Sequence, residues 1–146
     1  MRPARLWTVS FGPAVTTALD VRTGEIAWQQ RGFGRASFVY ADGKAIVIDE
    51  DGDLALVRLS PTGMTVLAEA RIFDTVSWTV PTLVGTTLYL ANGFTGLQTL
   101  DVSDPANPAP LGSFPMASNT VDVGVDSAEA VAYVVNFGGG MYSLDV

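Results

Sequence analysis

The chain has 146 residues, of which 48% are hydrophobic and 16% are charged, with a formal net charge of -7 and neither cysteine nor histidine. Nucleic-acid binding draws on clustered Lys and Arg, so this acidic balance argues against such a partner. The missing residue types exclude disulfides, thiolate nucleophiles, and the most common general base and transition-metal ligand. β-branched and aromatic residues are spread along the whole chain, which indicates one all-β domain with a sizeable core.

The first part of the chain predicts three short strands, over residues 6–10, 14–21 and 25–29. The turn before the third strand carries three residues with separate roles. The Asp20 carboxylate can accept hydrogen bonds from backbone amides of the turn, and Thr23 can do the same more weakly. Gly24 can take the positive φ that a tight reversal often needs. Trp28 then lies on the outgoing strand.

The next part predicts a complete set of four strands, over residues 36–40, 45–49, 54–59 and 65–71. Between the second and third of them, Asp49, Asp51 and Asp53 resemble the opening of a calcium-binding loop. Ser60 stands where such a loop needs its bidentate glutamate, and no helices flank the segment. A polar hairpin with an Asp-Gly turn therefore explains these residues best, and a weak surface cation site is the alternative.

The remaining chain predicts seven strands, over residues 77–84, 87–91, 97–102, 111–114, 121–125, 131–135 and 141–146. Asp101 ends one strand, and Asp104, Pro105 and Pro108 form the rigid polar turn that follows it. Several large side chains fall at strand spacing, which predicts packing in the core or between repeats rather than a cofactor site. They are Met64, Trp78, Tyr89, Tyr133 and Tyr142. No segment predicts a helix.

Two landmarks recur along the chain with a period of about 40 to 45 residues. One is an apolar strand, found at Ala45–Asp49, Thr87–Ala91 and Val131–Val135. The other landmark is the short apolar segment that leads into the polar turns at Asp20 and Asp101. A period of this size made of short strands is typical of propeller blades, which are four-stranded antiparallel sheets. We therefore predict a single all-β segment over 1–146, a partial β-propeller of about 3.5 blades.

The strand pattern places the predicted blades at about 5–31, 35–72, 77–115 and 119–146, with the first and last incomplete. Incomplete blades leave open sheet edges, which are templates for pairing with another chain. The sequence therefore predicts self-association or membership of a longer polypeptide. It shows neither a signal peptide nor an apolar run of membrane-spanning length.

The spacing of Asp20, Thr23, Gly24 and Trp28 resembles the tryptophan-docking motif of PQQ-like, or quinoprotein-type, propeller repeats. From about Tyr89 onward, the run from Gly96 to Pro108 and the later Ala132–Val134 look instead like an LVIVD repeat. The first resemblance implies that Trp28 docks against a neighbouring blade while the other three residues hold the turn. Both resemblances suggest bacterial proteins of the periplasm or cell surface.

Quinone-dependent dehydrogenases of this superfamily use adjacent cysteines, an Asp base, and calcium bound by Glu and Asn. This chain has no cysteine, and no group of its acids can be matched to that site. We therefore predict no catalytic residues, no cofactor and no metal beyond the weak candidates Asp49, Asp51 and Asp53.

The leading hypothesis is a non-enzymatic propeller module that acts as a scaffold or protein-interaction surface. The first alternative is a fragment of a quinone-dependent dehydrogenase or another ligand-binding propeller. Its nearest candidate residues would be Asp49, Asp51, Asp101 and Asp104, all of which are explained more simply as turn residues. A lectin-like role is the second alternative.

Overall fold

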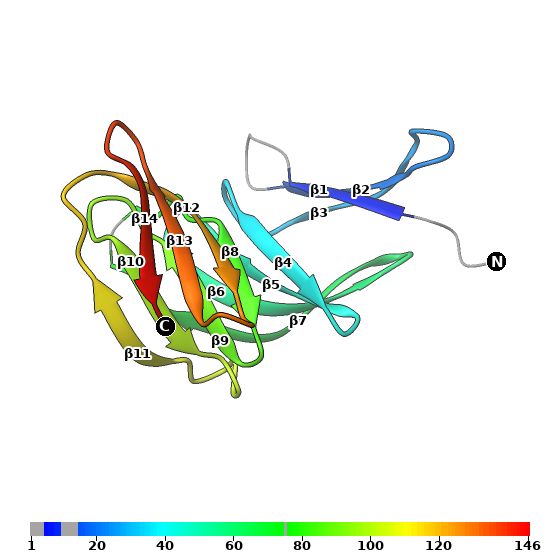
Figure 1. Ribbon diagram of the computed structural model, residues 1–146. Helices are drawn as coiled ribbons and strands as arrows, with labels where there is room; N and C mark the ends of the chain where they lie inside the picture. The colour runs from blue at the N-terminus through cyan, green and yellow to red at the C-terminus, as the bar shows by residue number, and fades with distance from the viewer. Residues whose placement is uncertain (1–4, 10–14, 75) are drawn as a thin grey trace.

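The computed structural model describes residues 5–9, 15–74 and 76–146. Within these ranges the chain forms fourteen strands and no helix, and the strands assemble into four antiparallel sheets. Figure 1 shows the sheets following one another in chain order, with β1–β3 on one side of the molecule and β12–β14 on the other. Among the described residues, no helix is long and apolar enough to span a membrane.

Within each sheet, every strand pairs with the strands next to it in sequence. The first sheet contains β1 (Arg5–Val9), β2 (Val15–Asp20) and β3 (Ile26–Arg31). The second contains β4 (Ser37–Ala41), β5 (Lys44–Ile48), β6 (Asp53–Ser60) and β7 (Gly63–Arg71). The third contains β8 (Pro81–Val84), β9 (Thr87–Ala91), β10 (Leu97–Asp101) and β11 (Ala109–Phe114). The fourth contains β12 (Thr120–Asp126), β13 (Val131–Asn136) and β14 (Gly140–Asp145).

The two middle sheets are covered by neighbours on both faces, which explains why β5 and β9 are almost uninterrupted apolar runs. Three hydrophobic clusters fill the spaces between consecutive sheets. The cluster between the second and third sheets contains Ile46, Ile48, Leu54, Leu88, Leu90, Leu100 and Val102. The one between the first and second contains Phe33, Ala45, Val47, Ala55, Val57 and Met64. The one between the third and fourth contains Tyr89, Ala91, Leu97, Val123, Ala132 and Val134.

The structure corrects the alignment of the second repeat by one residue. Lys44 opens β5 as Thr87 opens β9, so Ala45 corresponds to Leu88 rather than to Thr87. The burial agrees, because Ala45 packs toward the first sheet and Leu88 toward the second, the preceding sheet in each case. A slip of one residue exchanges the faces of a strand. The sequence alone does not reveal this slip, because both faces of β5 are apolar.

A second correction concerns the strand expected over residues 77–84, which begins only at Pro81. Proline has no N–H to donate, so it suits the first position of a strand better than the interior of a ladder. Residues 76–80 precede the strand and take no part in its pairing.

Candidate interaction surface

The predicted turn at Asp20 is held by its own side chains. Asp20 Oδ1 accepts a hydrogen bond from the Arg22 backbone N–H at 2.9 Å, and Thr23 Oγ1 accepts one from the Glu25 N–H at 3.2 Å. Gly24 has a φ of +75°. Trp28 packs against the cluster between the first and second sheets, and its Nε1–H donates to the Ser60 carbonyl at 3.0 Å. These residues therefore form a turn and a contact between sheets.

The candidate cation-binding acids have partners within the protein. Asp49 is buried, and its Oδ1 accepts hydrogen bonds from the backbone N–H groups of Asp51 at 3.0 Å and Asp53 at 3.1 Å. Burial, as the largest cause, raises the pKa of Asp49 above its ordinary value. Asp53 forms an ion pair with Arg71 at 3.2 Å. These contacts give Asp49 and Asp53 roles in the hairpin itself.

The acids of the long turn after β10 also make local contacts. Asp101 Oδ1 accepts from the Ser103 N–H at 2.8 Å, and this hydrogen bond is the main reason that the pKa of Asp101 lies below its usual value. Asp104 accepts from the Ala106 N–H at 3.1 Å and from Asn107 Nδ2 at 2.8 Å. Pro105 and Pro108 lie in the same turn and are partly buried.

The acids considered for an enzyme are not brought together. Asp49 and Asp51 lie in the β5–β6 hairpin. Asp101 ends β10 and Asp104 follows it, at the opposite end of the third sheet from the β9–β10 hairpin. Across the part of the chain that the structure describes, no group of three or more acidic residues could hold a metal ion.

A different feature stands out at the end of the sheets that carries the β5–β6, β9–β10 and β13–β14 hairpins, which we call the hairpin end. In residues 76–80, the polar Ser77 and Thr79 are buried while Val76, Trp78 and Val80 are exposed. The alternation has the two-residue period of extended backbone, but its apolar side faces solvent. Exposed large apolar side chains are more informative about function than buried ones.

Hydrogen bonds to two neighbouring hairpins fix this orientation. The Ser77 N–H donates to the Glu50 carbonyl at 2.9 Å, and the Ser77 hydroxyl donates to Asn92 Oδ1 at 2.9 Å in a buried position. Breaking a buried polar pair costs the desolvation of both groups. The segment therefore cannot rotate to bury Trp78 without losing these bonds.

Trp78 stands between two hollows. One, of about 400 Å³, is lined by Arg35, Ala36, Ser37, Trp78 and Val80. The other, of about 410 Å³, is lined by Val76, Trp78, Asn92, Gly93, Phe94, Thr95, Asn119, Thr120 and Val121. The Arg35 guanidinium lies 5.7 Å from the centre of the indole ring, within the range of a cation–π interaction. The indole is thus oriented, although it is 67% exposed.

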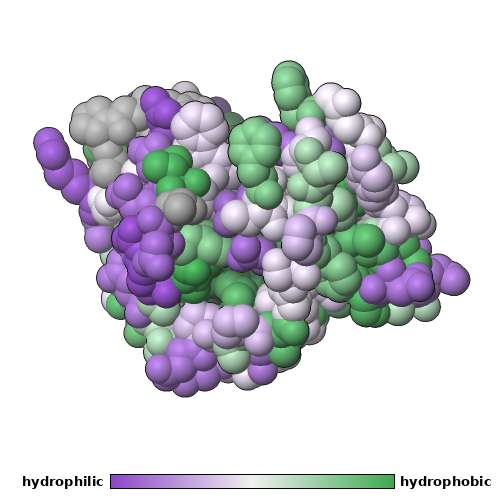
Figure 2. Space-filling model, turned by 90° about the vertical axis from the view of Figure 1, so that its left-hand side faces the viewer, coloured by the Kyte–Doolittle hydropathy of each residue, from purple (hydrophilic) through white to green (hydrophobic). Residues whose placement is uncertain are grey.

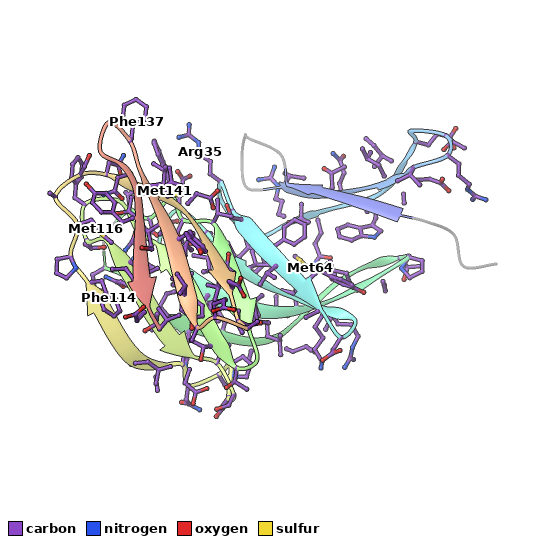
Figure 3. The ribbon with its side chains drawn as sticks, viewed as in Figure 1. Arg35, Met64, Phe114, Met116, Phe137 and Met141 are labelled. Atoms are coloured by element: carbon purple, nitrogen blue, oxygen red, sulfur yellow. The ribbon has the colours of Figure 1, made fainter. Side chains whose placement is uncertain are left out.

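Two phenylalanines extend the apolar area. Phe94 in the β9–β10 hairpin is 80% exposed, and Phe137 in the β13–β14 hairpin is 77% exposed. The Phe137 N–H donates to the carbonyl of Asn119, which lines the second hollow, at 2.7 Å. Figure 3 places Phe137 and Arg35 at the same end of the molecule, and Figure 2 shows hydrophobic side chains projecting at that upper edge.

We call the set Val76, Trp78, Val80, Phe94 and Phe137 the Trp78 surface. Its existence corrects the prediction that Trp78 packs in the core, whereas Met64 and Tyr89 are buried as predicted. Tyr133 and Tyr142 are each 42% exposed. Tyr133 lies on the face of the fourth sheet that has no described neighbour, whereas Tyr142 pairs with Val134 and lies on the covered face. In the sequence, the feature that could have indicated an exposed Trp78 is the alternation of apolar and polar residues from Val76 to Val80. Its period alone does not say which side is buried.

Comparisons with solved structures identify the fold. The β-propeller domain of Myceliophteria thermophila Cps50 (Swd1) matches with a TM-score of 0.75 and 9% identity, over 97% of this chain and 50% of that one. BamB from Moraxella catarrhalis matches with a TM-score of 0.67 and 14% identity, over 97% of this chain and 40% of that one. The chain is a partial β-propeller. The predicted all-β array of about 3.5 four-stranded blades is confirmed.

This partial propeller also matches the computationally designed protein Ika4, with a TM-score of 0.70 and 12% identity, over 96% of this chain and 85% of that one. The chain thus spans half or less of the two natural propellers but most of the designed one. No family model and no curated protein matches the sequence.

Proposed function

We propose that the chain is a non-enzymatic propeller module that binds a polypeptide through the Trp78 surface. The observation that carries the proposal is the inverted alternation of residues 76–80, which keeps Trp78 in solvent while two polar neighbours are bonded inside. Tryptophan is among the residues most enriched at the centres of protein interfaces.

The shape of the surface suits side chains of a partner. The two hollows on either side of Trp78 measure about 400 and 410 Å³, and apolar side chains of a docked segment could enter both. Phe94 lines the second hollow, and Phe137 lies next to it through its hydrogen bond to Asn119, so both side chains would cover such a segment. The net charge of -7 favours encounter with a basic partner. We therefore propose a segment with apolar anchors and a positive net charge.

Selection from a random peptide library displayed on phage, followed by binding measurements, tests this proposal. We expect selected peptides to combine aromatic or aliphatic residues with Lys or Arg, and Trp78→Ser to weaken their binding by about tenfold or more. The matched control is Leu111→Ser, which removes a 59% exposed apolar side chain from β11 in the third sheet. The control should bind as the wild type does.

Three results would contradict the proposal. They are the absence of any selected binder, equal losses in the Trp78 and Leu111 variants, and binding that Trp78→Ser leaves intact. Because Trp78 is exposed, its replacement should leave the unfolding temperature almost unchanged, which separates loss of binding from loss of fold.

A small polar ligand is the second candidate, and one observation favours it. Thr120 lines the second hollow, is 1% exposed, and its hydroxyl has no hydrogen-bond partner among the described residues. Titration with calcium and a soluble quinone, read as a thermal shift, tests the dehydrogenase form of this alternative. A shift that Thr120→Val abolishes would favour it over the peptide proposal.

A further inference from the structure

We propose that two copies of this chain close into one ring, the fourth sheet of each copy packing on the first sheet of the other. The contact would join the sheet faces that have no described neighbour. Four sheets from each copy would give a ring of eight. This assembly is independent of what the Trp78 surface binds.

The open face of the fourth sheet carries three apolar side chains in its middle, with Asp122 and Ser143 beside them. Tyr133 and Val135 alternate along β13 with Ala132 and Val134, which are fully buried against the third sheet. Tyr133 is 42% exposed and Val135 is 38% exposed. Met141 pairs with Val135 across β13 and β14, so it shares the open face, and it is 67% exposed. Figure 3 shows Met141 on β14, below Phe137.

The same positions in the other sheets are the ones that contact the next sheet. β9 and β13 correspond residue by residue, so Tyr133 and Val135 stand where Tyr89 and Ala91 stand in the third sheet. Tyr89 and Ala91 pack against the fourth sheet and are 8% and 0% exposed. The fourth sheet therefore carries the side chains of a contact between sheets at a face where no following sheet is described.

The first sheet offers the matching side. Ala18 and Trp28 are paired and face the second sheet. The register shifts by one residue after this pair, so that Leu19 pairs with Ile26 and Ala27 is left out. Leu19 directly follows Ala18 and therefore points to the other face together with its partner Ile26, which is 56% exposed. A preceding sheet would cover this face in a longer array. One chain thus carries both halves of a contact between sheets, at its two ends.

A second copy fits this pair of faces better than an unrelated protein does. Head-to-tail contacts between identical chains form closed rings when the rotation closes. Propellers close with about four to eight blades, so two copies of a four-sheet array reach a permitted number. The length agrees with the Cps50 propeller domain, of which this chain covers 50%.

Light scattering coupled to gel filtration tests the proposal on the full chain. We expect a species with twice the chain mass of 15.4 kDa. Val135→Glu on the fourth sheet and Ile26→Glu on the first should each yield monomers, with dissociation constants raised about tenfold or more by a buried unpaired charge. Leu111→Ser, at an exposed position on β11 of the third sheet, should remain dimeric and serves as the control.

Mixing the two charge variants provides a second test of the ring. A ring made of one Val135→Glu chain and one Ile26→Glu chain keeps one wild-type contact, so the mixture should regain the two-chain mass. This recovery also shows that each variant is folded. A monomeric wild type, open filaments, a dimer that survives both substitutions, or no recovery on mixing would overturn the proposal. Loss of peptide binding in Trp78→Ser with the dimer intact would separate this result from the proposed function.

Discussion

Strands β9 and β13 occupy corresponding places in the third and fourth sheets but differ in their surroundings. β9 is buried along nearly its whole length, whereas β13 alternates between buried and exposed residues. Their sequences, TLYLA and VAYVVN, are both mainly apolar. The difference therefore comes from the number of neighbouring sheets rather than from the strand. Although β13 is exposed on one face, it therefore has the composition of a strand that is covered on both faces.

The largest expected effect comes from truncating a side chain of the covered strand. Leu90 on β9 is 0% exposed, so Leu90→Ala should lower the free energy of unfolding by about 2–5 kcal/mol through lost burial and the cavity left behind. Val135→Ala on β13 should cost about 1 kcal/mol or less in dilute solution. Urea denaturation measures both.

The dependence of these two stability costs on protein concentration tests the difference between β9 and β13 further. If the open face of β13 is covered in a dimer, the cost of Val135→Ala should grow with protein concentration, whereas that of Leu90→Ala should not. Equal costs for the two substitutions at every concentration would remove the distinction between the strands.

Two glycines give a closer comparison with an intermediate effect. Gly96 follows β9 with a φ of +86°, and Gly140 follows β13 with a φ of +88°. A Cβ at Gly96 would collide with the backbone of Phe114 and Met116, whereas a Cβ at Gly140 would meet nothing within 4 Å. Gly140→Ala should cost about 1–2 kcal/mol from backbone conformation alone. Gly96→Ala should cost about 1–3 kcal/mol more.

Thermal denaturation of the two alanine variants checks this difference. Similar shifts in both would mean that the segment after β11 yields easily to the added methyl group, or that Gly140 is also crowded in solution. The second outcome would point to an additional strand beside β14.

The smallest effect concerns the hairpins that follow β5 and β9. Asp49 follows β5 where Asn92 follows β9, and burial raises the pKa of Asp49. In Asp49→Asn the amide Oδ1 can still accept from the N–H groups of Asp51 and Asp53. The variant should therefore be more stable than the wild type at neutral pH.

The sign follows from proton binding. A raised pKa means that the folded wild type binds more protons than the unfolded chain, so its stability falls as the pH rises from the unfolded pKa through the folded one. The advantage of Asp49→Asn should grow over that interval and be constant above it. Chemical denaturation from pH 3 upward measures it, about pH 4 being the ordinary value for Asp. A constant difference across the interval would mean that Asp49 titrates normally.

Much of the fold was predictable because short apolar runs and turn residues recur with a regular period. The strand ends near Asp20, Asp49 and Asp101 were located from their turn chemistry, which is local. The one-residue slip in β5 was not, because a strand covered on both faces has no polar side to fix its register. The division of the chain into blades at the stated residues, and its being a single domain, stay predictions.

The Trp78 surface could not be predicted from the sequence, for a related reason. An alternation of Val76, Ser77, Trp78, Thr79 and Val80 ordinarily places the apolar side in the core. The bond from Ser77 to Asn92 reverses it, and that contact joins residues from different segments. Of the strand predicted over residues 77–84, only Pro81–Val84 pairs with a neighbour. The direction of the side chains depended on a partner that only the folded chain supplies.

The pairing of each strand with its sequence neighbour has a consequence for how the chain acquires its structure. Every ladder closes through a short connection, so little loop entropy is lost before contacts form. Hairpins can form independently, and each completed sheet offers a template for the next, as in other repeat proteins. During synthesis on the ribosome, the sheets near the N-terminus can therefore begin to fold before the last residues are made.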